Sequence, residues 1–185
     1  MGTIKTTNIE PIADNGTVTL GSSGDTFTVP SGVTVNMSSA TQTGVGGVNT
    51  PAFRAYLSGN QSISSDSAVK INFDAETFDT NNAYDTSTYK FTVPSGQAGK
   101  YFFYCQLRKG TTTSNLTLVY FYVNGSSKGY VRQTTASQNT NQISHIIDLS
   151  AGDYVEIYAY DAGGSASILS NADNYSYFTG YKLIE

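Results

Sequence analysis

Residues 88–104 read TYKFTVPSGQAGKYFFY, and this stretch decides the fold. Apolar side chains alternate on both sides of a central Pro-Ser-Gly, which is the pattern of two strands joined by a turn. Pro94 has no N–H to give to a sheet ladder, so it ends the first strand, and the Ser-Gly pair turns the chain. The second strand places Tyr101 and Phe103 on one face. The stretch therefore predicts a β-protein built from short strands.

Alternation of the same kind continues toward the C-terminus, and helical periodicity is hard to find. Residues 116–123 are apolar on both faces, so this strand is expected to be covered on both sides. The Asn124-Gly125 pair predicts a tight hairpin turn at its end. Many short strands, spaced about 8–12 residues apart, favour a sandwich or a barrel. Further strands are expected at residues 143–149, 155–159 and 177–184.

The composition supports a β-rich chain and excludes some partners. The chain has 185 residues, with 14 Tyr, 9 Phe and 18 Gly, and 13% of its residues are charged, below the roughly 25% of ordinary globular proteins. The net charge of −4 and the scattered Lys and Arg argue against phosphate-based nucleic-acid binding. No run is long enough to span a membrane, and the first residues show no secretory signal.

The hexapeptide FTVPSG occurs twice, at 27–32 and at 91–96. A duplicated domain would need matching sequence beyond the hexapeptide, and the flanking residues differ. The repeat is therefore interpreted as one strand-and-turn unit that arose twice. The segments before Thr43 are short, polar and rich in Gly, Ser and Thr. Such segments cannot bury enough apolar surface to fold alone. The sequence predicts an extended, β-rich attachment or trimerisation arm over 1–49 and a β-domain over 50–185.

An ordered set of positions carries a family resemblance. The matching segments are PAFRAYLSG, YVNG, DLSAGDYVEI and YFTGYKL, and the matching single residues are Phe73, Asp79, Tyr84, Phe91, Gly99, Tyr101 and Phe103. With this set, the β-domain resembles the globular head of complement C1q, a jelly roll shared with the tumour-necrosis-factor ligands. Three positions depart from the family pattern: Gln97-Ala98 lengthens a loop, Cys105 replaces an aromatic residue, and Tyr181 replaces a closing Phe.

The resemblance implies an all-β, C1q/TNF-like jelly-roll sandwich that assembles as a homotrimer. A strand that is apolar on both faces needs a partner beyond its own sheet, and a domain of this size has no third layer. The trimer core is expected to contain Tyr104, Tyr120, Phe121 and Tyr122.

The sequence offers no arguable catalytic set, so the chain is not expected to be an enzyme or to need a cofactor. His145 is the one histidine, and nothing orients it for nucleophilic catalysis. Cys105 lies in an apolar run and is expected to pack as a small hydrophobic residue. Some members of the resembled family hold calcium near the trimer axis, so a structural calcium ion with oxygens from Asp161 and Asp173 is a further hypothesis.

Recognition, where it exists, is expected in loops carried on the rigid sandwich. Three segments are long enough: 110–115, 133–142 and 161–175. The third is richest in amides, carboxylates and tyrosines, which suit a surface glycan or protein. The alternative is that these residues are solvated turns of a purely structural cap. The candidate receptor-binding residues are Asp161, Asn171, Asp173, Asn174 and Tyr175.

Two functions remain for such a knob. Residues 2–35 resemble the Ser/Thr/Gly-rich N-terminal segments of bacteriophage fibre and head-decoration proteins, notably those of marine phages. This resemblance implies a virion protein, assembled in the host cytoplasm, whose arm contacts other virion proteins while the knob projects and binds the host surface. The alternative is a cellular C1q-like adhesin or lectin-type module. Neither function involves nucleic acid or membrane insertion.

Overall fold

A computed structural model describes residues 19, 21–35, 49–64, 66–110, 115–135, 139–162, 165–171 and 175–183. The chain divides into two units, Met1–Val45 and Gly46–Glu185, and each is described by itself. The arm boundary expected between residues 49 and 50 stays a prediction. Within the described ranges, no helix of the length and apolarity that membrane crossing requires is present.

The two FTVPSG copies share a turn but not a strand. Val33 N–H donates to the Pro30 carbonyl at 3.3 Å, and Gln97 N–H donates to the Pro94 carbonyl at 3.1 Å. Residues 27–29 form no strand, whereas β6 (Lys90–Thr92) does. The strand expected in the first copy was therefore wrong, because a strand needs a partner and only the second copy has one. The local interpretation of the repeat agrees with this difference.

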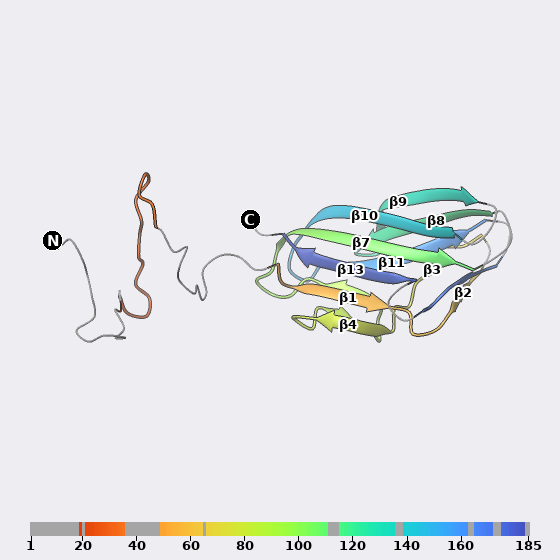
Figure 1. Cartoon of the computed structure of the whole chain (residues 1–185), viewed down its shortest axis with the longest axis horizontal. Coiled ribbons are helices and arrows are strands. Elements are labelled where there is room, and N and C mark those ends of the chain that lie inside the picture. Colours follow the sequence, from red (N-terminus) through yellow and green to blue (C-terminus); the bar gives the residue numbers. More distant parts are fainter. Residues whose placement is uncertain are drawn as a thin grey trace. The chain divides into compact units, whose positions relative to one another are not determined.

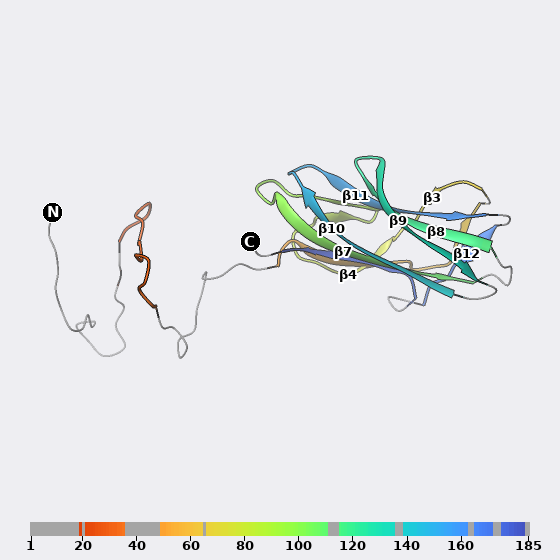
Figure 2. The same cartoon turned by 90° about the horizontal axis from the view of Figure 1, so that it is seen from above.

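The second unit is a sandwich of two antiparallel sheets (Figures 1 and 2). One sheet has the order β2-β12-β7-β13-β1-β4, with β10 paired to β7, and the other has the order β5-β6-β11-β8-β9, with β3 paired to β11. The all-β prediction is confirmed. The remaining bounds are β1 (Ala52–Tyr56), β2 (Gln61–Ile63), β3 (Val69–Lys70), β4 (Ala75–Asp79), β5 (Tyr84–Asp85), β7 (Gly99–Lys109), β8 (Asn115–Val123), β9 (Ser126–Thr135), β10 (Asn139–Leu149), β11 (Tyr154–Asp161), β12 (Ala166–Ile168) and β13 (Tyr177–Lys182).

Aromatic rings fill the space between the two sheets. Phe53 of β1 stacks on Tyr84 and Phe91 of the opposite sheet, with ring centroids 5.1 and 5.0 Å apart, and meets Phe178 edge-on at 4.9 Å. Such ring pairs add about 0.5–1.5 kcal/mol each to the burial of their area. Cys105 is fully buried in this core, and burial raises the pKa of its thiol. Cys105 therefore packs as a small apolar residue, as expected.

Pairing of β1 with β13 brings the two ends of the domain together. Ala52 lies opposite Tyr181 in the ladder, and Lys182 N–H donates to the Pro51 carbonyl at 3.0 Å. The chain therefore enters and leaves the sandwich at one end. Leu57, which follows β1, lies at the other end, where its N–H donates to the Ser176 carbonyl. This second end carries the loops that form the polar cleft described below.

Candidate functional site

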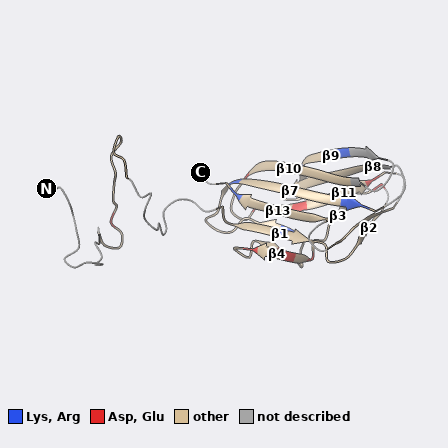
Figure 3. Ribbon diagram, in the orientation of Figure 1, with Lys and Arg blue, Asp and Glu red and all other residues tan. Residues whose placement is uncertain are grey.

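The outer face of the seven-stranded sheet carries exposed apolar side chains. Ile146 lies opposite Phe102, which in turn lies opposite Tyr181, so these three side chains form one row across β10, β7 and β13. Ile146 is 56% exposed, and Phe78, on the β4 edge of the same face, is 46% exposed. Figure 3 shows that most of β7, β10 and β13 carries no charge. This face, defined by these four residues, is called the apolar face below.

Tyr104 lies on the apolar face, beside Tyr177, with ring centroids 5.7 Å apart. Burial and the contact with Tyr177 raise the pKa of Tyr104 to about 12. The Arg54 guanidinium lies 3.8 Å from the centre of the Tyr177 ring. The two rings and the guanidinium together make an amphipathic surface with one positive charge, which suits contact with another protein surface.

The outer face of the six-stranded sheet carries a row of tyrosines. Tyr130 of β9, Tyr120 of β8 and Tyr158 of β11 lie directly opposite one another across three strands. Tyr122 joins this tyrosine row, with its ring 6.0 Å from that of Tyr120 and 4.3 Å from that of Tyr158. Tyr130 and Tyr158, on the strands beside β8, therefore flank the outward tyrosines of β8. The outer face of β8 is thus partly covered by its own sheet, although its sequence is apolar on both faces.

The four residues expected in a trimer core do not share one surface. Phe121 is fully buried between the sheets, where its ring contacts Phe103 and Phe178. Its inclusion was wrong, because Phe121 alternates with Tyr120 and Tyr122 and faces inward. Tyr104 lies on the opposite sheet from these two tyrosines. A single outer face therefore carries either Tyr104 or the Tyr120–Tyr122 pair.

The candidate receptor residues are also divided by the structure. Asp161 is 0% exposed and forms an ion pair with Lys109, whose Nζ lies 2.7 Å from the Asp161 carboxylate. Its assignment to an exposed recognition loop was wrong, because Asp161 ends β11 with its side chain in the interior. Asn171 is exposed, and the Arg108 guanidinium lies 4.2 Å from the centre of the Tyr175 ring. Asp173 and Asn174 lie outside the described residues.

The expected recognition loops are shorter than the sequence indicates. Most of 133–142 belongs to β9 and β10, and β12 occupies part of 161–175. Among the described residues, no three His, Cys, Asp or Glu side chains converge as metal ligands. A calcium ion at Asp161 would have to compete with the Lys109 ammonium for the same carboxylate. The calcium hypothesis stays a prediction, with this contact against it.

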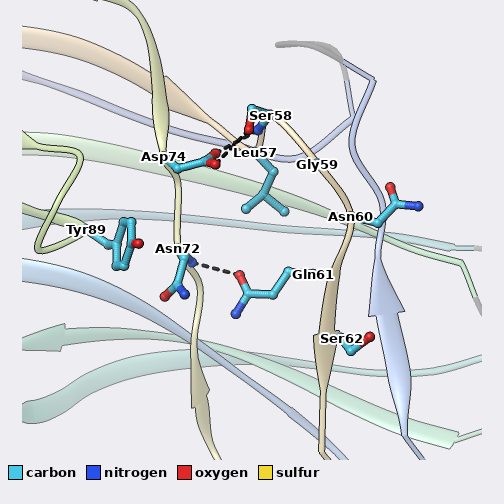
Figure 4. Close-up of a pocket in the computed structure, with 9 residues that line it drawn as sticks. All are labelled: Leu57, Ser58, Gly59, Asn60, Gln61, Ser62, Asn72, Asp74 and Tyr89. Atoms are coloured by element: carbon cyan, nitrogen blue, oxygen red, sulfur yellow. Dashed lines mark hydrogen bonds between the residues drawn. The ribbon is translucent and has the colours of Figure 1, made fainter.

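A polar cleft lies at the end of the sandwich where β1 leads into β2, and sequence reasoning missed it. Its volume is about 370 Å³, within the roughly 300–1,000 Å³ typical of small-molecule sites. Figure 4 shows Tyr89 beside Asn72 on one side, with the segment 58–62 along the other. The lining residues are Leu57, Ser58, Gly59, Asn60, Gln61, Ser62, Asn72, Asp74 and Tyr89.

Hydrogen bonds fix the polar side chains of this cleft. The Asp74 carboxylate accepts from the Ser58 N–H at 2.8 Å and from the Ser58 hydroxyl at 2.7 Å. Burial raises the pKa of Asp74, but the bonds from Ser58 outweigh it and hold the pKa below the ordinary value of 3.8. The Gln61 amide accepts from Asn72 N–H and donates to the Lys70 carbonyl, both at 2.8 Å. Asp74 is therefore ionised and positioned at neutral pH.

Comparison with known proteins identifies the family. The family model described as "C1q domain" matches residues 52–183. The chain belongs to the C1q domain family. Domains of this family are generally non-enzymatic binding or structural modules and typically form homotrimers. No curated protein matches this sequence.

Solved structures agree on the fold. The C1q-domain chain is similar to murine APRIL at pH 5.0, with a TM-score of 0.55, 13% identity, and coverage of 71% of this chain and 98% of that one. It is similar to the globular domain of zebrafish complement 1qA, with a TM-score of 0.51, 15% identity, and coverage of 73% and 98%. It is also similar to the Eiger TNF of S. frugiperda, with a TM-score of 0.52, 13% identity, and coverage of 72% of this chain and 92% of that one. The predicted C1q/TNF-like jelly roll is confirmed.

Proposed function

We propose that this C1q domain is a non-enzymatic knob whose three copies meet through the apolar face. The exposure of Ile146 and Phe78 is the observation that carries the proposal. Exposed apolar side chains on one face of a domain favour an interaction site, and members of this family typically form homotrimers. The tyrosine row is the competing candidate, because Tyr130 is also exposed.

A pair of matched substitutions tests which face is the interface. Ile146→Asp places a charge on the apolar face, and Tyr130→Asp places the same charge on the tyrosine row, where Tyr130 is 60% exposed. Light scattering at micromolar concentration is expected to give a trimer for the wild type and Tyr130→Asp and a folded monomer for Ile146→Asp. A monomeric wild type contradicts the trimer, and dissociation by Tyr130→Asp alone moves the interface to the other sheet.

We further propose that the trimer belongs to a virus particle, as a phage fibre or capsid-decoration knob assembled in the host cytoplasm. The support is the arm: residues 2–35 resemble the Ser/Thr/Gly-rich anchoring segments of such proteins, and the described part of this arm forms no strand or helix of its own. The arm is proposed to bind other virion proteins and the knob to bind the host surface, without nucleic acid or membrane insertion.

The alternative is a cellular C1q-like adhesin. The membership of this chain in the C1q domain family supports the adhesin as well as it supports the virion protein. Purified particles separate the two. Mass spectrometry of the particles is expected to find the chain at a fixed copy number that is a multiple of three. Its absence from particles, together with its presence on the cell, supports the adhesin and contradicts the virion proposal.

A further inference from the structure

We propose that the polar cleft of Figure 4 binds a neutral sugar, as a recognition site separate from the apolar face. The proposal goes beyond the trimeric knob and does not depend on it. It rests on three properties of the cleft: fixed polar groups with hydrogen-bonding capacity left over, an aromatic ring held beside them by an unusual backbone, and a single formal charge.

The fixed polar groups keep capacity for a ligand. The Asp74 carboxylate accepts two bonds from Ser58 and one from its own backbone N–H, which leaves one of its about four lone-pair sites for a ligand. The Asn60 carbonyl oxygen accepts from Ser170 N–H at 2.8 Å, which orients its amide. The Asn72 side chain can both donate and accept. Groups that are already positioned lose little entropy on binding, so these hydrogen bonds favour a ligand rich in hydroxyl groups.

Tyr89 is held beside the cleft in a conformation that a bulky residue rarely adopts. Its φ is 56°, in the left-handed region. Its N–H donates to the Asp85 carbonyl at 2.6 Å, and the Asp85 carboxylate accepts from Ser87 and Thr88, which holds the Asp85 pKa below its ordinary value. Backbone strain of this kind persists only where surrounding contacts impose it, and it concentrates at functional sites.

The charge of the cleft selects the class of ligand. Of the nine lining residues, Asp74 alone carries a formal charge. A phosphate or an acidic sugar would meet a fixed carboxylate with no cation among the lining residues. A calcium ion needs six to eight oxygens, with several carboxylates in strong sites. A neutral sugar fits best: its hydroxyls donate to Asp74 and exchange bonds with the amides, while its C–H face lies against the Tyr89 ring.

The probes are four free sugars: D-glucose, D-galactose, D-mannose and N-acetyl-D-glucosamine. Saturation-transfer NMR on the full chain is expected to detect at least one of them, with a Kd on the order of 1–10 mM. Asp74→Asn keeps the shape of the cleft, and Tyr89→Gly accommodates the positive φ while removing the ring. Each is expected to weaken binding at least tenfold. Asp148→Asn removes an exposed carboxylate on β10 and is the matched control.

The proposal is overturned if none of the four sugars binds, if binding survives both cleft variants, or if EDTA abolishes it and so reveals a metal site. Melting temperatures check that each variant folds. The Ile146→Asp variant separates this proposal from the trimer, because it leaves the cleft unchanged. Loss of the trimer with retained sugar binding supports both proposals independently.

Discussion

Lys109 and Asp161 show how one pair of residues changes the interpretation of a loop. From the sequence, Asp161 stands at the start of a polar segment and looks available to a ligand. In the structure, it ends β11 facing inward, where it neutralises a lysine that is 3% exposed. The Lys109 ammonium also donates to the Thr117 hydroxyl at 3.2 Å. The pair is therefore a structural element of the sandwich.

Breaking this pair is expected to be costly. Asp161→Asn leaves the buried Lys109 charge uncompensated, so it should reduce the free energy of unfolding by about 3–5 kcal/mol. Replacing both residues by apolar ones, Lys109→Met with Asp161→Leu, should recover most of this loss. Urea denaturation at pH 7 measures both. Asp148→Asn, at the surface, should change stability by about 0.5 kcal/mol or less, and a similar small effect for Asp161→Asn would show that Asp161 is not buried as described.

Asp74 makes a prediction about pH. Its pKa in the folded chain is below 3.8, so the contribution of the ionised carboxylate is fully present above about pH 4 and is lost as pH falls through the folded pKa. Ser58→Ala removes the hydroxyl donor and should raise the Asp74 pKa toward 3.8. Carboxyl ¹³C NMR titration of the two proteins checks this. An unchanged pKa would mean that the Ser58 hydroxyl does not hold the carboxylate in solution.

At the scale of the strands, Gly180 explains how the closing strand β13 packs closely against the Phe103 ring of β7. A Cβ built at Gly180 would lie 2.4 Å from the Phe103 ring and 3.0 Å from the Phe102 carbonyl oxygen. Contacts this short do not occur, so the ring and β13 would have to separate. The glycine in the FTG sequence is therefore required by close packing of β13 on β7.

Gly180→Ala is expected to destabilise the domain by about 1–3 kcal/mol through overpacking. Gly59→Ala is the matched control, since a Cβ there meets nothing within 4 Å. Thermal unfolding of the two variants beside the wild type measures the difference. Equal melting temperatures for both variants would contradict the packing described for β13.

The strands were largely predictable, and the cleft was not. The alternation of inward and outward side chains located β7, β10, β11 and β13, and a run that is apolar on both faces located β8. The Asn124-Gly125 turn also formed as expected, with both residues at positive φ. The cleft combines residues 57–62, 72, 74 and 89, which lie in three separate segments and share no motif. Only the fold brings these segments together, and no local propensity indicates the positive φ of Tyr89.

For the whole molecule, the arm and the knob are expected to be separable. The described core lies entirely in the second unit, and Phe27 in the first is 70% exposed. Deleting residues 1–48 should therefore leave a soluble knob with an unchanged melting temperature and an unchanged trimer. Under the virion proposal, the deleted form should no longer join particles. An unfolded knob would place the domain boundary earlier than residue 49.

The pairing of β1 with β13 has a mechanical consequence. Because the chain enters the sandwich at Ala52 and the cleft lies beyond the other end of β1, a pull between tether and bound ligand runs along this strand. Its ladder bonds to β13 and β4 lie across that direction. These hydrogen bonds would be loaded together in shear and would not open one after another. A knob held by its N-terminal side should therefore resist forces that would separate an edge strand from its sheet.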